Sequence, residues 1–251
     1  VGLDPDPARL PLPAMQWDDP VLPFNKRIIE ATVDLVCAYK PNVGFYMQWG
    51  AAGLVALERT IAYIPDEIPV ILDAKIGDIG NTQSAWAAGV FDTWEVDAVT
   101  VNPYVGADAF LPMVGERPDK AVYVLARTSN ASALDFQGDL QAEQGLSAEV
   151  LRCSQEWPVQ GHIGYVVGAT YPAELAVARR LAPHASFLIP GIGAQGGDLA
   201  AAVTYGAHDG IGPVISASRS VLYAAPGTDF VDAARAAARD LRDQINGLRS
   251  S

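Results

Sequence analysis

The sequence is short of cysteine, histidine and long apolar runs, and each shortage removes a class of protein. Cys37 and Cys153 are its two cysteines. They lie far apart without the spacing of a metal site, so we expect reduced thiols in a cytoplasmic protein. No His-x-His, Cys-x-x-Cys or dense carboxylate cluster occurs, and we expect no metal. No apolar run approaches the ~20 residues of a membrane-spanning helix, so no membrane partner is expected.

Basic residues are also scarce. Seventeen Lys and Arg face 29 Asp and Glu, which gives a formal net charge of −12. This balance argues against nucleic-acid binding, but a small anionic ligand needs only a local cluster of donors. We recognise no signal peptide, although the sequence opens at Val1 without a Met, as it would if an upstream segment were missing.

Short apolar runs typical of β-strands alternate along the chain with segments of helical periodicity. This alternation predicts a parallel sheet. The expected strands are 1–3, 38–45, 70–75, 98–102, 121–126, 163–168, 187–190 and 212–217. The expected helices are 26–37, 51–63, 81–91, 107–114, 142–156, 172–181, 199–205 and 230–248.

Eight strand–helix units in 251 residues predict an α/β fold, a TIM (β/α)₈ barrel, as a single domain over residues 1–251 with its first strand truncated. The alternative is an open doubly wound sheet. The stretch 191–196 fits the dinucleotide pattern G-x-G-x-x-G, which favours that alternative. However, a dinucleotide site needs an acid at the end of the next strand, and the strand at 212–217 has none there. The polar segment 129–145 is interpreted as a long loop after strand five.

The most informative stretch is residues 73–82, Asp-Ala-Lys-Ile-Gly-Asp-Ile-Gly-Asn-Thr, which follows a buried apolar strand. Strand alternation predicts that Asp73 and Lys75 share one face, and Asp78 follows at the turn. Charges at the end of an apolar strand are costly to bury, so this array suggests chemistry. The simpler interpretation is a strand-end ion pair.

Further polar residues fall at the ends of the other strands, where barrel active sites lie. They include Asp4, Lys40, Asn102, Arg127, Thr128 and Ser129. The glycine-rich loop 191–197, with Gln195, and the Ser218–Arg219 pair follow strands seven and eight, the usual phosphate site of such barrels. A bidentate guanidinium suits phosphate. The alternatives are a surface ion pair for Arg219 and an exposed loop residue for Gln195.

These motifs together resemble orotidine 5′-monophosphate decarboxylase, in its longer bacterial subfamily. The resemblance covers the chain and includes Val-Gly-Leu-Asp at 1–4, Tyr-Lys-Pro at 39–41, the Asp73-x-Lys75-x-x-Asp78-Ile79-x-Asn-Thr82 signature, Thr-Ser at 128–129, Pro-Gly-Ile-Gly-Ala-Gln-Gly-Gly-Asp at 190–198 and Ser-Arg-Ser at 218–220. The chain departs from the family where Ser218 replaces the Gly of many members and where the segment after Ser129 is longer than in the short forms.

The resemblance implies a cofactor-free homodimer with shared active sites that converts orotidine 5′-monophosphate to UMP and CO₂. It implies four catalytic residues: Lys75 as the proton donor to C6, Asp73 facing the substrate carboxylate, Asp78 reaching the neighbouring subunit's site, and Lys40. It implies a larger substrate-binding set. That set is Asp4 and Lys40 at the ribose, Ile79, Thr82 from the neighbouring subunit, Ser129 at the pyrimidine, Pro190, Gln195 between base and phosphate, Ser218, and Arg219 at the phosphate.

Two other functions stay open. One is a Mg²⁺-dependent keto-sugar-phosphate decarboxylase of the same suprafamily, for which no additional acid is found at the strand ends. The other is a non-catalytic nucleotide-binding barrel, which predicts loss of the Asp73 or Lys75 role, yet both residues are present.

Overall fold

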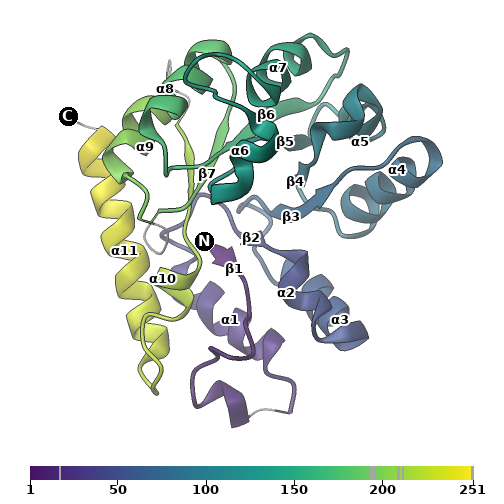
Figure 1. Cartoon of the computed structure of the whole chain (residues 1–251). Helices are drawn as coiled ribbons and strands as arrows, with labels where there is room; N and C mark the ends of the chain where they lie inside the picture. The colour runs from purple at the N-terminus through teal and green to yellow at the C-terminus, as the bar shows by residue number, and fades with distance from the viewer. Residues whose placement is uncertain (17, 193–195, 208–209, 211, 250–251) are drawn as a thin grey trace. The chain divides into compact units, whose positions relative to one another are not determined.

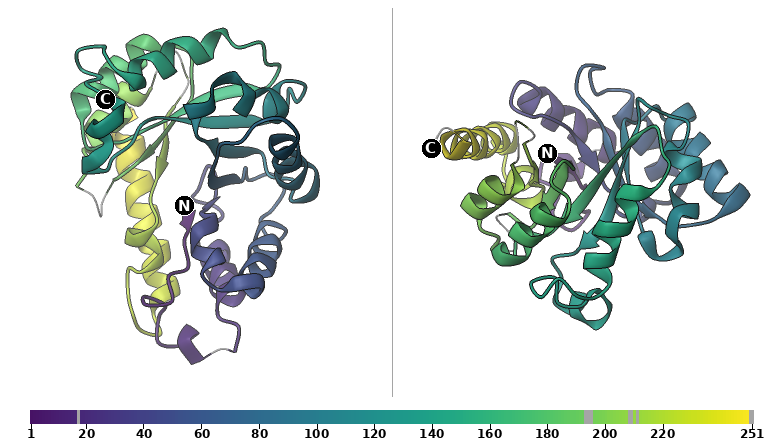
Figure 2. Two further views of the ribbon diagram at one scale, coloured as in Figure 1. Left: turned by 45° about the vertical axis from the view of Figure 1, so that its right-hand side comes forward. Right: turned by 90° about the horizontal axis from the view of Figure 1, so that it is seen from above.

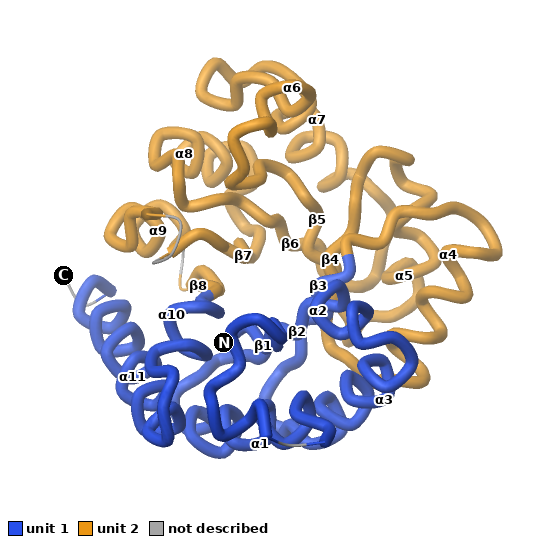
Figure 3. Tube along the Cα trace, turned by 60° about the horizontal axis from the view of Figure 1, so that its bottom comes forward, with its two compact units in different colours: residues 1–74, 217–251 blue, residues 75–216 orange. Residues whose placement is uncertain are grey.

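The computed structural model describes residues 1–16, 18–192, 196–207, 210 and 212–249, and it divides into two compact units. Unit 1 comprises residues 1–74 and 217–251, and unit 2 comprises residues 75–216 (Figure 3). Each unit is described by itself. The predicted single domain over residues 1–251 stays a prediction.

Unit 1 contains two short parallel strands and five helices among its described residues (Figure 1). They are β1 (Gly2–Leu3), α1 (Val21–Thr32), β2 (Lys40–Pro41), α2 (Val43–Met47), α3 (Gly50–Ile61), α10 (Arg219–Leu222) and α11 (Phe230–Arg249), with a 3₁₀ turn at Ala14–Gln16. Strand β3 (Ile71–Ile76) begins in this unit and ends in unit 2. Isolated parallel bridges join Tyr39 to Val70 and Asn42 to Asp73, so β2 runs beside the start of β3.

The core of unit 1 forms where α1 packs against α11. The ring of Phe24 stacks on Tyr223 and on Phe230, with centroids 6.2 and 5.8 Å away. The buried residues of α11 are Phe230, Ala234 and Ala238, which recur every four residues on one face of the helix. Figure 2 shows α11 as one uninterrupted helix.

Unit 2 alternates strands and helices in the predicted order. Its elements after β3 are α4 (Gly80–Ala87), β4 (Ala98–Val101), α5 (Leu111–Val114), β5 (Ala121–Arg127), α6 (Leu134–Gln137), α7 (Leu146–Cys153), β6 (His162–Val167), α8 (Pro172–Leu181), β7 (Phe187–Pro190), α9 (Leu199–Gly206) and β8 (Val214–Ser216). A π-helical turn (Ala88–Thr93) extends α4, and 3₁₀ turns occupy Pro103–Ala109, Ala131–Ala133 and Ser154–Glu156. The strands are parallel in sequence order from β3 to β8, and β4 is buried throughout, as expected for a sheet covered on both faces.

Three sequence predictions differ from the structure. The strand predicted over 38–45 is shorter in the structure. It is the two-residue strand β2, because Asn42 ends it and caps α2. The helix predicted over 26–37 lies at Val21–Thr32. Pro23 is tolerated there because the first turn of a helix leaves its N–H groups without helical partners. The loop predicted over 129–145 contains α6 and a 3₁₀ turn. None of the described helices combines the length and the hydropathy that a membrane-spanning segment requires.

Candidate active site

A buried ion pair in unit 1 joins β2 to the first half of β3. The Lys40 Nζ donates to Asp73 Oδ2 at 3.1 Å, and both side chains are about one-tenth exposed, at 10% and 11%. The Asn42 amide Nδ2 donates to the same carboxylate oxygen at 3.0 Å. Asp73 therefore takes part in a buried ion pair with a lysine that lies 33 residues earlier in the chain.

Burial alone would lower the pKa of Lys40. Asp4 and Asp73 outweigh that effect, and the pKa of Lys40 is raised above its usual value. Lys40 therefore stays charged at neutral pH between two acids. Asp4 is buried, and its Oδ1 is a buried atom with no hydrogen-bond partner among the described residues. Such an atom is costly unless a ligand donates to it, so Asp4 is a candidate ligand-binding group.

Two tyrosines fix the backbone around Asp4. The Tyr46 hydroxyl donates to the Leu3 carbonyl at 3.0 Å, and the Tyr223 hydroxyl donates to the Asp4 carbonyl at 2.7 Å. Burial raises the pKa of Tyr46 far above its usual value and that of Tyr223 to about 12. Both hydroxyls therefore remain protonated donors, and the Asp4 carboxylate is held on a rigid backbone.

Ser218 meets the other side of β1. A Cβ placed on Gly2 would lie 1.9 Å from the Ser218 Oγ and 3.3 Å from Asp4 Oδ2, so any larger residue at position 2 would force the Ser218 side chain to move. The amide of Gly2 donates to the Ala217 carbonyl at 2.8 Å, which holds the two segments together. Arg219, the first residue of α10, is exposed. Unit 1 thus gathers Asp4, Lys40, Asp73 and Ser218, as the sequence predicted.

Lys75 is exposed in unit 2, and its backbone departs from extended geometry. Its φ is +50°, in the left-handed region that costs a non-glycine residue about 1 kcal/mol or more. The alternation that predicted a shared face with Asp73 is thus interrupted at Lys75. The buried Thr100 of β4 helps to hold this conformation, because its Oγ1 accepts from the Lys75 amide at 2.9 Å.

The segment after β3 carries Asp78, Ile79 and Thr82. Asp78 Oδ1 accepts from the Ile79 amide at 2.8 Å, and the Asp78 amide donates to the Gln83 Oε1 at 3.2 Å. Gln83 is fully buried and also donates to the Ala109 carbonyl. Gln83 therefore ties the turn at Asp78 to the segment after β4, while Ile79 and Thr82 are exposed.

Ser129 and Pro190 follow β5 and end β7. A Cβ on Gly168 would lie 2.9 Å from the Ser129 Cβ, so the Ser129 backbone rests directly on the end of β6. The Pro190 carbonyl accepts from the Ala169 amide at 3.0 Å. Arg127, noted beside Ser129 in the sequence, is buried and pairs with Glu174 at 2.6 Å, which gives it a structural role. Gln195 lies outside the described residues.

Asn42 and Thr100 were missed by sequence reasoning. Asn42 both binds Asp73 and caps α2, its Oδ1 accepting from the Gly44 amide at 3.0 Å. An Asn after Lys-Pro and two residues before a Gly is an N-cap signal that could have found it. Thr100 had no signal, because a Thr inside a strand is ordinary.

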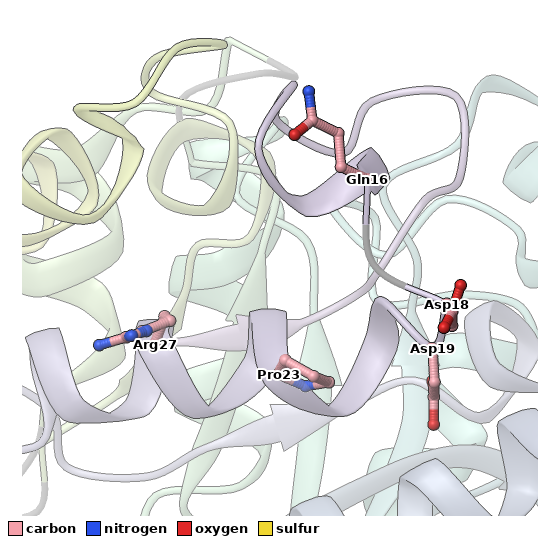
Figure 4. Close-up of a pocket in the computed structure, with 5 residues that line it drawn as sticks. All are labelled: Gln16, Asp18, Asp19, Pro23 and Arg27. Carbon is pink, nitrogen blue, oxygen red and sulfur yellow. The ribbon is translucent and has the colours of Figure 1, made fainter.

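Unit 1 also contains a hollow of about 580 Å³ that is lined by other residues. Figure 4 shows its lining, Gln16, Asp18, Asp19, Pro23 and Arg27. Arg27 forms an exposed ion pair with Glu30 at 3.7 Å. The hollow contains none of the predicted site residues.

The chain is similar to a family model and to named relatives over nearly its whole length. The family model described as Orotidine 5'-phosphate decarboxylase / HUMPS family matches residues 3–237. A Thermomicrobium roseum protein named orotidine 5'-phosphate decarboxylase is 48% identical over 254 residues, covering 99% of this chain and 90% of that protein.

Solved structures agree. That of Leishmania donovani OMP decarboxylase is 39% identical with a TM-score of 0.85, covering 100% of this chain and 93% of the other. That of Leishmania donovani UMP synthase is 40% identical with a TM-score of 0.86, but this chain spans only 53% of its length. These similarities confirm the predicted (β/α)₈ barrel and exclude the open doubly wound sheet.

Proposed function

Because this chain belongs to the orotidine 5'-phosphate decarboxylase / HUMPS family and is a decarboxylase of that kind, we propose how its residues convert orotidine 5′-monophosphate to UMP and CO₂. The reaction belongs to pyrimidine biosynthesis. The observation that carries the proposal is the charged pair Asp73 and Lys75 on one strand, with Asp73 held by Lys40.

Lys75 is the proposed proton donor. Loss of CO₂ leaves a carbanion at C6 of the pyrimidine, a carbon without a convenient electron sink. An ammonium group at that carbon stabilises the developing negative charge and then donates its proton. The left-handed backbone at Lys75 supports this role, since strained residues persist where function requires a particular side-chain direction.

Asp73 is proposed to face the substrate carboxylate. Two carboxylates about 4 Å apart repel by ~4 kcal/mol at an effective dielectric of 20. That repulsion disappears as CO₂ leaves, which favours the reaction. Lys40 and Asn42 support the assignment because they hold the Asp73 carboxylate in place as an anion.

The remaining residues are proposed to bind the nucleotide. Asp4 and Lys40 bind ribose hydroxyls, a role that suits the buried unpartnered Oδ1 of Asp4. Binding energy from the phosphate, far from the reacting carbon, orders the site. The full proposed binding set is Asp4, Lys40, Ile79, Thr82, Ser129, Pro190, Gln195, Ser218 and Arg219. No cofactor is proposed.

We also propose a homodimer in which Asp78 and Thr82 serve the neighbouring subunit's site. Support comes from exposed apolar side chains on the segments that Gln83 ties together in unit 2. They are Ile79, Trp86, Tyr104 and Val105, of which Tyr104 is 83% exposed. Such a patch is typical of a protein interface. The proposal places the enzyme in the cytoplasm, with a small nucleotide as its substrate and neither nucleic acid nor membrane as a partner.

The decisive experiment is a spectrophotometric assay of orotidine 5′-monophosphate with EDTA present. We expect undiminished turnover. Activity that vanishes with the chelator and returns with Mg²⁺ would favour the metal-dependent sugar-phosphate alternative. Nucleotide binding without turnover would favour the non-catalytic barrel.

Shared sites are tested with mixed dimers of Asp73→Ala and Asp78→Ala chains. Each variant alone is expected to be inactive, and the mixture should regain activity because one of its two sites has both acids intact. Mixed dimers that are verified by mass and show no recovery would contradict sharing.

A further inference from the structure

The loop after β5 is held by a side chain from α6, the short helix that follows this loop (Figure 1). The Thr128 amide donates to the Gln137 Oε1 at 2.9 Å, and the Gln137 Nε2 donates to the Thr128 Oγ1 at 2.8 Å. Thr128 Oγ1 then donates to the Asn130 Oδ1 at 2.6 Å. The chain of hydrogen bonds therefore fixes the residues on both sides of Ser129.

The backbone of Ser129 packs closely against Gly168. The end of β6 supports it from behind, because any side chain at Gly168 would collide with its backbone, and the Gly168 amide donates to the Arg127 carbonyl at 2.8 Å. With Gln137 on one side and Gly168 on the other, the position of Ser129 is determined by both contacts.

Gln137 is itself anchored by a closed loop that follows it. Gly138 and Gly145 have φ of +74° and +84°, and a Cβ on either would lie 2.7 Å from the Cα of the other. They form the neck of a loop whose Glu143 carboxylate pairs with Arg152 at 3.3 Å and Arg180 at 2.5 Å. Single exposed pairs contribute little, but two arginines on one carboxylate fasten the loop to α7 and α8.

We propose that Gln137 is a positioning residue that sets Ser129 for its contact with the pyrimidine. The inference rests on the proposed function, which gives Ser129 that contact. Gln137 acts through Thr128 and does not touch the substrate. Removing its amide frees the loop and weakens recognition of the base, while the sugar-phosphate contacts stay intact.

The test compares Gln137→Met with Gln141→Met, the same change at an exposed residue of the same loop. Calorimetry measures the affinity for UMP, which carries the base, and for ribose 5-phosphate, which lacks it. We expect Gln137→Met to bind UMP about tenfold more weakly, the effect of losing one or two hydrogen bonds, and to bind ribose 5-phosphate as the wild type does. Gln141→Met should match the wild type with both ligands.

A third variant, Gln137→Glu, keeps the acceptor for the Thr128 amide and should recover part of the UMP affinity. Thermal unfolding checks that each variant is folded. Equal UMP affinity in Gln137→Met and Gln141→Met would overturn the inference, and so would an equal loss for both ligands in a folded variant. Wild-type protein that fails to decarboxylate orotidine 5′-monophosphate would instead overturn the proposed function.

Discussion

The two proposed catalytic lysines, one in each unit, differ in burial and in backbone conformation. Lys40 is buried at the end of β2, bonds to Asp73 at 3.1 Å and has a raised pKa. Lys75 is exposed at the end of β3 on a left-handed backbone, with its amide bonded to Thr100. Lys40 is thus a buried charge held in place by an ion pair, whereas Lys75 is an exposed side chain on a left-handed backbone.

The difference indicates that the two lysines have different roles. A buried lysine between two acids keeps its proton and organises the carboxylates around it. A proton donor must instead reach the substrate, and an exposed ammonium can do so. The predictions below test this difference.

The largest expected effect follows Lys75→Ala. Loss of the charge and of the donor should lower kcat by about 10³- to 10⁴-fold, because both the electrostatic and the proton-transfer contributions disappear. UMP affinity, measured by calorimetry, should stay within severalfold of the wild type. A turnover number near the wild-type value would refute the proton-donor role.

Lys40→Met should chiefly destabilise the fold. Removing one partner of a buried pair leaves Asp73 charged beside Asp4, at a cost of about 3–5 kcal/mol in the free energy of unfolding. Urea titration measures this loss. The double variant Lys40→Met/Asp73→Asn should recover part of it, and strictly additive losses would contradict the pairing.

The pH dependence of unfolding gives a second measure of the Lys40 pair. The pKa of Lys40 is raised from 10.5, so its contribution is complete below about pH 10.5 and is lost as the pH rises through the folded-state value. Buried tyrosines titrate in the same range, so Lys40→Met serves as the reference. The wild type should lose more stability than this variant above pH 10.5, and parallel curves would argue against the raised pKa.

Asn42→Ala should cost about 1–2 kcal/mol, since it removes the α2 cap and one hydrogen bond to Asp73. Urea unfolding measures the loss. Asn42→Asp separates the two functions, because it keeps the cap but places a second carboxylate beside Asp73. If Asn42→Asp is as active as the wild type, the bond to Asp73 has no part in the reaction.

The smallest effect concerns the backbone of Lys75. Glycine in a strand is normally less stable than alanine by 0.5–1 kcal/mol. At φ +50° the order should reverse, with Lys75→Gly about 1 kcal/mol more stable than Lys75→Ala. Thermal unfolding of the two inactive variants compares them directly. The usual order would show that the left-handed conformation does not carry strain.

The sequence predicted the order of the elements and the strand ends at which Asp4, Lys40 and Asp73 gather, because alternation and apolar runs persist over many residues. It did not predict the left-handed φ of Lys75, because the conformation of a single residue does not alter the periodicity of the sequence. It also missed Asn42 and Gln137, whose roles arise from contacts with residues that only the fold brings close. The helix predicted at 26–37 lies at Val21–Thr32, because Pro23 is accommodated in the first turn of the helix.

The close approach of Ser218 to Gly2 couples the residues that the fold accepts at positions 2 and 218. The Ser218 hydroxyl occupies the volume that any side chain at position 2 would need. A larger residue at position 2 therefore requires the Ser218 side chain to move, and a Ser218→Gly change would remove the obstruction at that hydroxyl. The substitutions that the fold tolerates at position 2 therefore depend on which residue stands at position 218.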